Sequence, residues 1–111
     1  MPLRLAGNGS SATDGYIEVF DKDNKKWGNI CKTSFDIIDA HVICNMLGFN
    51  TAIAASANIA DYDLNDPHFV LDDLNCDGTE TSVFDCPLTG ESNGQCDASE
   101  VAGVECSESK L

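Results

Sequence analysis

The stretch V-L-D-D-L-N-C-D-G-T-E-T-S-V-F-D-C-P, at residues 70–87, combines a short apolar run, an acidic pair and two cysteines. The apolar run is typical of a strand, and Asp72 and Asp73 follow it directly. Cys76 and Cys86 then bracket a segment rich in Asp, Glu, Thr and Gly. This pattern predicts a strand, an acidic rim and a cross-linked turn, and the acidic rim is either a cation site or a solvated edge.

The six cysteines of this 111-residue chain indicate its redox environment. They are widely spaced, without the C-x-x-C pairs that are typical of zinc ligands, so three disulfides are the better interpretation. Disulfides place the protein in an oxidising compartment, whereas six buried thiols in a cytosolic protein would go against the usual distribution. The length predicts a single domain, which we assign to residues 1–107, with a C-terminal tail or added end at 108–111.

The N-terminal residues are interrupted too soon by Gly and Asn to form a secretory signal, and no segment is long and apolar enough to cross a membrane. We therefore expect an extracellular module excised from a larger secreted or membrane-anchored protein, without direct membrane insertion. Asn8 begins an N-x-S sequon and is a predicted glycosylation site in such a protein.

Charge is unevenly distributed along the chain. Residues 1–32 sum to +1 and residues 33–111 to −14, which gives a net charge of −13. This balance argues against sequence-specific nucleic-acid binding through phosphate neutralisation. Divalent cations, basic proteins and a local basic patch remain as binding partners. Such a patch is offered by Lys22, Lys25, Lys26 and Lys32.

The first third of the chain has the alternating pattern of strands. Residues 3–5 predict a short strand, and residues 16–20 and 26–31 predict a hairpin closed by an Asp- and Asn-rich turn. Trp27 is expected to be a core anchor, because a single aromatic residue within a strand usually packs in the core.

Residues 36–48 change to the apolar period of a helix. The apolar positions expected on one face are Ile38, Val42, Ile43, Met46 and Leu47. Candidate N-caps are Ser34, Asp36 and Asp39, and Gly48 suits the end of the helix. Because Cys44 lies within this segment, one disulfide should attach the helix to a sheet.

The second half of the chain gives weaker signals. Residues 51–60 suit a loop or a poorly defined strand, 68–74 a strand, 82–84 a single helical turn, and 101–106 a last strand. The D-Y-D-L-N-D run at 61–66 spaces oxygen donors like a calcium loop. Asp66 occupies the position where an EF-hand needs Gly, so Asp61 and Asp63 remain only weak candidate ligands.

Six segments share one order and spacing with a known family. They are L-R-L at 3–5, W-G-N-I-C at 27–31, A-H-V-I-C-N-M-L-G-F at 40–49, L-D-D-L-N-C-D-G-T-E at 71–80, C-P at 86–87 and A-G-V-E-C at 102–106. Together they resemble the scavenger receptor cysteine-rich (SRCR) domain in its six-cysteine, group A form. The resemblance implies an α+β fold in which a curved antiparallel β-sheet of about six strands cradles one α-helix. It also implies that Cys31 pairs with Cys96, Cys44 with Cys106, and Cys76 with Cys86.

The resemblance also implies cation sites built from acidic residues. One family cluster uses two Asp after the cysteine of W-G-x-x-C and a Glu before A-G-V, and the corresponding residues here are Lys32, Thr33 and Glu100. Loss of two carboxylates should weaken or abolish that cluster. A second cluster uses Asp72 and a polar side chain at Gln95. We therefore predict at most a weak Ca²⁺ or Mg²⁺ site. Its candidate ligands are Asp72, Asp73, Gln95 and Glu100, with Asp61 and Asp63 as weaker ones; the alternative is that these groups only solvate the surface.

Binding is the function class that these observations favour. The leading hypothesis is an extracellular ligand-binding or adhesion module with weak divalent-cation dependence. Two alternatives are polyanion binding through the lysines at 22, 25, 26 and 32, and a spacer between other domains of the parent protein. An enzyme is not expected, because the cysteines are expected to be oxidised and neither His has a neighbour that forms a nucleophile arrangement.

Overall fold

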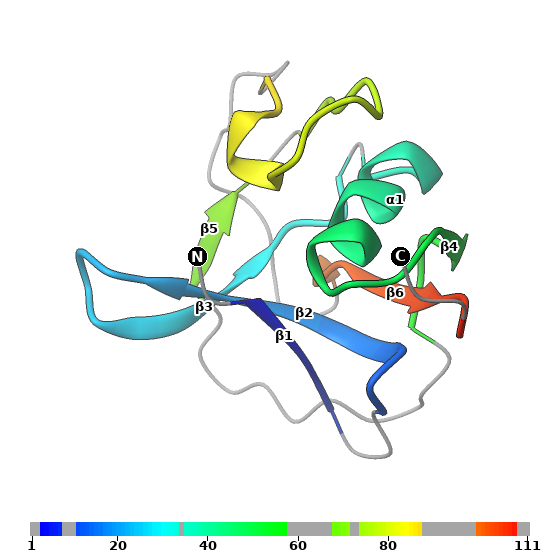
Figure 1. The fold of residues 1–111 in the computed structure, drawn as a ribbon. Coiled ribbons are helices and arrows are strands. Elements are labelled where there is room, and N and C mark those ends of the chain that lie inside the picture. The colour runs from blue at the N-terminus through cyan, green and yellow to red at the C-terminus, as the bar shows by residue number, and fades with distance from the viewer. Residues whose placement is uncertain are drawn as a thin grey trace.

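The computed structural model describes residues 3–7, 11–33, 35–57, 68–71, 74–87 and 100–108. Six strands form one curled sheet, and one α-helix packs over it (Figure 1). The strands are β1 (Leu3–Ala6), β2 (Asp14–Asp21), β3 (Lys26–Ile30), β4 (Ala52–Ala54), β5 (Phe69–Leu71) and β6 (Gly103–Cys106). Their order is β4-β6-β2-β3-β5, with β1 paired to β2.

The sheet is mixed, because β5 runs parallel to β3 while the other strand pairs are antiparallel. The predicted sheet of about six strands around one helix is confirmed, but the expectation of a purely antiparallel sheet is wrong for this pair. The reason is topological. The chain passes through α1 and β4 between β3 and β5, and such a long crossover allows two strands to run in the same direction.

Strands β1, β2 and β3 confirm the elements predicted for the first third of the chain. Leu3 pairs with Val19, and the β2–β3 hairpin pairs Phe20 with Trp27. The turn residue Lys25 adopts a positive φ of 54°. Of the later predictions, the loop or poorly defined strand at 51–60 contains the short strand β4 within its described residues. The strand at 68–74 is reduced to β5 within the described residues, and the last strand begins at Gly103.

Alternate residues of the strands build the core. The side chains of Ile17, Val19, Ile30 and Val104 are fully buried on the sheet face covered by the helix. Trp27 belongs to the opposite face, so its prediction as a core anchor is wrong. Because side chains alternate along a strand, pairing with Phe20 places Trp27 outside.

Helix α1 (Ile37–Met46) begins with a capping box. The Asp36 side chain accepts the Ile38 and Asp39 backbone N–H groups, and the Asp39 carboxylate accepts the Asp36 N–H in return. Of the three predicted caps, Asp36 is the N-cap. The buried positions include Ala40, Val42, Ile43 and Cys44. Ile38 is 42% exposed, so it does not belong to the buried face as predicted.

Two of the three expected disulfides join described residues. Cys44 bonds Cys106 and thereby attaches α1 to β6, which orients the helix face toward the sheet. Cys76 bonds Cys86 across the segment that contains the 3₁₀ turn η1 (Val83–Asp85), which confirms the predicted helical turn. Cys31 is also disulfide-bonded, but its predicted partner Cys96 lies outside the described residues.

Candidate functional site

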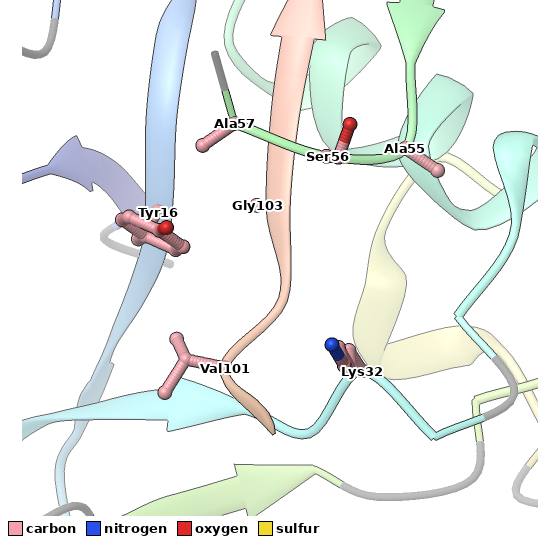
Figure 2. Close-up of a pocket in the computed structure, with 7 residues that line it drawn as sticks. All are labelled: Tyr16, Lys32, Ala55, Ser56, Ala57, Val101 and Gly103. Carbon is pink, nitrogen blue, oxygen red and sulfur yellow. The ribbon is translucent and has the colours of Figure 1, made fainter. Parts of the chain in front are cut away.

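A hollow of about 150 Å³ opens where the chain after β4 crosses β6 (Figure 2). Its lining residues come from β2, the end of β3, the crossing segment and the start of β6: Tyr16, Lys32, Ala55, Ser56, Ala57, Val101 and Gly103. By strand alternation, Tyr16 and Gly103 face away from the core, whereas their neighbours Ile17 and Val104 are buried in it. The hollow therefore lies on the sheet face opposite the helix.

Gly103 allows the crossing segment to lie close to β6. A Cβ atom at this position would be 2.7 Å from both the Cβ and the backbone N of Ala57, which is closer than side-chain atoms pack. Any other residue would push the segment away from the strand. The hollow thus depends on the missing side chain of Gly103, as well as on the small side chains of Ala55 and Ala57.

The backbone of Lys32 is held on both sides. Its N–H donates to the carbonyl of Glu100 at 2.7 Å, and its carbonyl accepts the N–H of Phe35 at 2.9 Å. The preceding Cys31 is completely buried and pairs with Val101 in a β-bridge. The Lys32 side chain is exposed and lies at the edge of the hollow opposite Ala57 (Figure 2).

Lys32 carries the one charge among the described residues that line this hollow. The described lining contains no carboxylate and no histidine, so it offers no general acid–base pair. A lysine ammonium is a compact point charge with three donors on a flexible stem. The arrangement is therefore suited to holding a small anionic group.

A second hollow, of about 190 Å³, lies at the other end of β3 beside the hairpin turn. Its lining residues carry both signs of charge: Phe20, Asp21, Lys22, Asp23, Val70 and Phe84. Because two carboxylates and one ammonium line the same space, this hollow has no clear preference for an anion or a cation.

Asp21 organises the hairpin turn. Its carboxylate accepts the Asp23 N–H at 3.0 Å and the Asn24 side-chain amide at 2.7 Å, and it lies 2.7 Å from Nε2 of His68. The hydrogen bond from the Asn24 side chain, followed by the one from His68, lowers the pKa of Asp21 from 3.8 to about 2. The carboxylate is therefore ionised at neutral pH, and it connects the turn to the residue that precedes β5.

The structure separates the four lysines predicted as one patch. Lys22, Lys25 and Lys26 lie at the hairpin turn and are exposed. Lys32 follows the opposite end of β3 and lines a different hollow. The first three lysines alone thus form a local basic cluster, which we call the turn lysines below.

Most of the predicted cation ligands cannot be placed. Asp61, Asp63, Asp72, Asp73 and Gln95 lie outside the described residues, as does the sequon residue Asn8. Glu100 is described: it is partly buried, and its backbone carbonyl accepts the Lys32 N–H.

The acidic segment between Cys76 and Cys86 has a structural arrangement in the described chain. The Glu80 carboxylate accepts the backbone N–H groups of Asp77 and Gly78, both at 3.0 Å. Ligand atoms of Cys76, Glu80 and Cys86 lie within 4.8 Å of one another, but both sulfurs are bonded in a disulfide. Metal binding through sulfur needs thiolates, so this cluster is not a metal site in the oxidised protein.

Asp39 has a structural role that the sequence pattern did not reveal beyond helix capping. One of its oxygens accepts the Cys76 N–H at 2.8 Å, and the other accepts the Asp36 N–H at 2.9 Å. The residue is 1% exposed, and burial raises the pKa of its carboxyl group. Asp39 thereby joins the start of α1 to the disulfide-bonded loop.

The sequence pattern pointed to Lys32 but not to the other residues of its hollow. Tyr16 and Gly103 appeared only as strand residues, and Ala55 and Ala57 as part of a weakly defined segment. No local motif connects these positions. Their proximity results from pairing between β2 and β6 and from the crossing segment, which sequence spacing does not encode.

Comparison with known proteins assigns the chain to a family. The profile of the scavenger receptor cysteine-rich domain matches residues 7–107. The chain therefore belongs to the SRCR domain family.

Relatives with this domain are much longer proteins. Lysyl oxidase homolog 3A of Danio rerio is 39% identical over 109 residues, which cover 98% of this chain and 14% of that protein. Galectin-3-binding protein of Mus musculus is 36% identical over 105 residues, which cover 95% of this chain and 18% of that protein. The chain thus spans less than a fifth of the length of these relatives.

Solved SRCR domains have the same fold over nearly their whole length. The dimeric form of the SRCR domain of mouse MARCO is 37% identical, with a TM-score of 0.68, and covers 92% of this chain and 89% of that one. The third SRCR domain of murine neurotrypsin is 30% identical, with a TM-score of 0.74, and covers 95% and 94%. No helix in the described part of this chain has the length and apolarity needed to cross a membrane.

Proposed function

We propose that this chain is an extracellular ligand-binding or adhesion module of a larger protein, of the six-cysteine group A type. The observation that carries the proposal is the family match over residues 7–107, in relatives of which the domain forms only 14–18%. The oxidation state agrees with it: every cysteine among the described residues is disulfide-bonded. Such cross-links persist in oxidising compartments. In that setting, Asn8 is a candidate for glycosylation.

The proposed activity is binding without catalysis. The lysyl oxidase homologues carry an enzyme's name, but that name belongs to proteins about seven times longer than the matched segment. Binding to another protein, or to other domains of its own parent protein, requires only a complementary surface. If neither protein nor polyanion ligands are found, the remaining assignment is a spacer domain.

A weak dependence on Ca²⁺ or Mg²⁺ is part of the proposal. The candidate ligands are Asp72, Asp73, Gln95 and Glu100, with Asp61 and Asp63 as additional oxygen donors. Calcium prefers six to eight oxygens, so these side chains would form an incomplete shell that a ligand carboxylate completes, as expected of millimolar-class sites.

A calcium titration followed by NMR tests the cation dependence. We expect saturable shifts of the Asp72, Asp73 and Glu100 amides, and smaller ones in D72N. If these amides do not move while the rest of the spectrum stays well dispersed, the domain has no cation site at these residues.

Polyanion binding is the second candidate function, and the turn lysines support it. Lys22, Lys25 and Lys26 are all exposed at one turn, where residues 21–26 sum to +1 although the net charge of the chain is −13. We expect heparin to bind weakly at low salt, and reversal of all three lysines to Glu to abolish binding. Binding that is unaffected by this reversal would rule out the turn lysines as the contact surface.

A further inference from the structure

We propose that the hollow at Lys32 is a specificity pocket for one acidic side chain, Glu or Asp, of a partner protein. The proposal does not involve the turn lysines, and of the candidate cation ligands only Glu100 enters it, through its backbone carbonyl. It rests on the charge, size, rigidity and surroundings of the hollow.

Charge defines the class of ligand. Lys32 supplies a positive charge at the edge of the hollow, and the described residues that line it include no carboxylate. The net charge of the chain is −13, so a hollow whose one charged residue in the described lining is a lysine differs from the acidic balance of the whole molecule. A carboxylate near this ammonium would form a charge-assisted hydrogen bond, which is about twice as strong as a neutral one.

The size of the hollow suits a single side chain. The hollow has a volume of about 150 Å³, whereas pockets for drug-sized molecules measure roughly 300–1,000 Å³. A carboxylate with one or two methylene groups fits this smaller space. The walls also suit such a chain, because Tyr16, Ala55, Ala57 and Val101 contribute apolar atoms beside the charged edge.

The site is formed before any ligand arrives. Hydrogen bonds to Glu100 and from Phe35 hold the Lys32 backbone on both sides, and Cys31 before it is completely buried. On the opposite edge, Ala57 is packed over Gly103 too closely to admit a Cβ atom. Binding therefore requires ordering of one lysine side chain rather than of a loop, which keeps its entropic cost low.

The surroundings favour a protein over a polyanion as the source of the carboxylate. Polyanions gain affinity from several cations along a chain, whereas Lys32 is the one cation among the described lining residues, and the net charge of −13 repels them at long range. Ile53, in the strand that leads into the crossing segment, is 59% exposed and is a large apolar contact for a protein surface. A single anchor pocket that carries much of the binding energy is typical of protein recognition.

The test uses N-acetyl-glutamate methylamide as a probe of the pocket. We expect its addition to the ¹⁵N-labelled domain to shift the amides of Lys32, Ala57 and Gly103, and N-acetyl-glutamine methylamide, which lacks the charge, to leave them unchanged. K32Q should lower the association constant by about tenfold or more. K25Q is the matched control: it removes the same charge from an exposed lysine at the other end of β3, and it should retain binding.

Three results would overturn the proposal. The first is equal response to the charged and neutral probes, which needs no variant and therefore does not depend on how K32Q folds. The second is equal loss of binding in K32Q and K25Q. This result would show that the probe is attracted by the positive charge of any exposed lysine rather than bound in a pocket. The third is tighter binding of a sulfated disaccharide than of the glutamate probe at the same amides, which would identify a polyanion as the occupant.

Discussion

The two ends of strand β3 carry lysines in contrasting settings. At its start, Lys25 and Lys26 extend from a solvated turn together with Lys22, with Asp21 and Asp23 close by. Just past its end, Lys32 stands at a hollow whose described lining has no acidic group. Although their sequence separation is small, these lysines cannot be expected to recognise the same ligand.

The contrast shows that the position of a lysine in the sheet determines how it attracts an anion. The turn lysines are exposed, so their attraction for an anion is long-range and weakened by salt. Lys32 has a fixed backbone and a hollow beside it, so its attraction is local and depends on the shape of the ligand. The following variants test this contrast and the packing around β3.

Replacement of Gly28 in β3 should have the largest effect. A Cβ atom there would lie 2.3 Å from Cγ2 of Val70 and 2.7 Å from the carbonyl oxygen of His68, so β5 would have to move. We expect G28A to lower the free energy of unfolding by about 3 kcal/mol, at the upper end for overpacking, as measured by urea denaturation. Adding V70A should recover part of this loss, whereas additive effects would indicate that Val70 is not the obstacle.

Replacement of Gly103 should have a smaller effect on stability and a larger one on binding. G103A places a Cβ atom 2.7 Å from Ala57, which follows the short strand β4 and is easier to displace than β5. We expect G103A to lower the free energy of unfolding by about 1–2 kcal/mol, as measured by urea denaturation. The glutamate probe should no longer bind, although G28A should still bind it. Normal binding to G103A would mean that the close crossing is not needed for the pocket.

The stability of the folded protein should depend on acidic pH through the carboxyl group of Asp21 in the hairpin turn. Since the pKa of its carboxyl group is lowered from 3.8 to about 2, it stabilises the folded state above pH 3.8, and this contribution is lost as the pH falls toward 2. We expect D21N to be less stable than the wild type at neutral pH and the difference to shrink over this acidic range. Urea denaturation at several pH values measures it, and a difference that is constant with pH would contradict the assigned pKa. D23N is the control at the same turn.

The smallest effect is expected on the outer face of the sheet, where Arg4 of β1 lies over Trp27 of β3. The Arg4 guanidinium lies 3.8 Å from the centre of the Trp27 ring, and its Nε is 2.6 Å from the Glu18 carboxylate. Because the Arg4 side chain is 51% exposed, we expect R4M to lower the free energy of unfolding by only about 0.5–1 kcal/mol. Thermal or urea denaturation measures this change. A decrease in the free energy of unfolding as large as that of G28A would show that the contacts of Arg4 with Trp27 and Glu18 support the fold.

Much of the fold was predictable from local pattern and from the family resemblance. The alternation of Ile17 and Val19 predicts β2, the helical period predicts α1, and the order of the motifs implies the Cys44–Cys106 and Cys76–Cys86 pairs. The face of the sheet occupied by Trp27 was not predictable in this way. It depends on register with Phe20, and a shift of one residue in register reverses which face a side chain occupies.

The candidate site was predictable only in part. Lys32 was identified as a binding residue from charge, but it was grouped with lysines that the structure places at the other end of β3. Asp39 was one of three candidate N-caps, whereas the N-cap is Asp36, and the hydrogen bond from the Cys76 N–H to Asp39 was not foreseen. In both cases the missing information concerns residues that are distant in the chain and adjacent in space.

The amino-acid sequence by itself determined the class of domain, its oxidised cysteines, its local elements and its acidic balance. The local elements and the acidic balance depend on residue type and on spacings of a few positions, and the oxidised cysteines on their number and spacing. The class of domain follows from the resemblance of six segments along the chain to the SRCR family. Only the tertiary structure decided that β5 runs parallel to β3, that Gly103 lies beneath Ala57, and that Lys32 borders a hollow of its own. Each of these depends on contacts between segments far apart in the chain, because burial and steric fit are established only when those segments pack together.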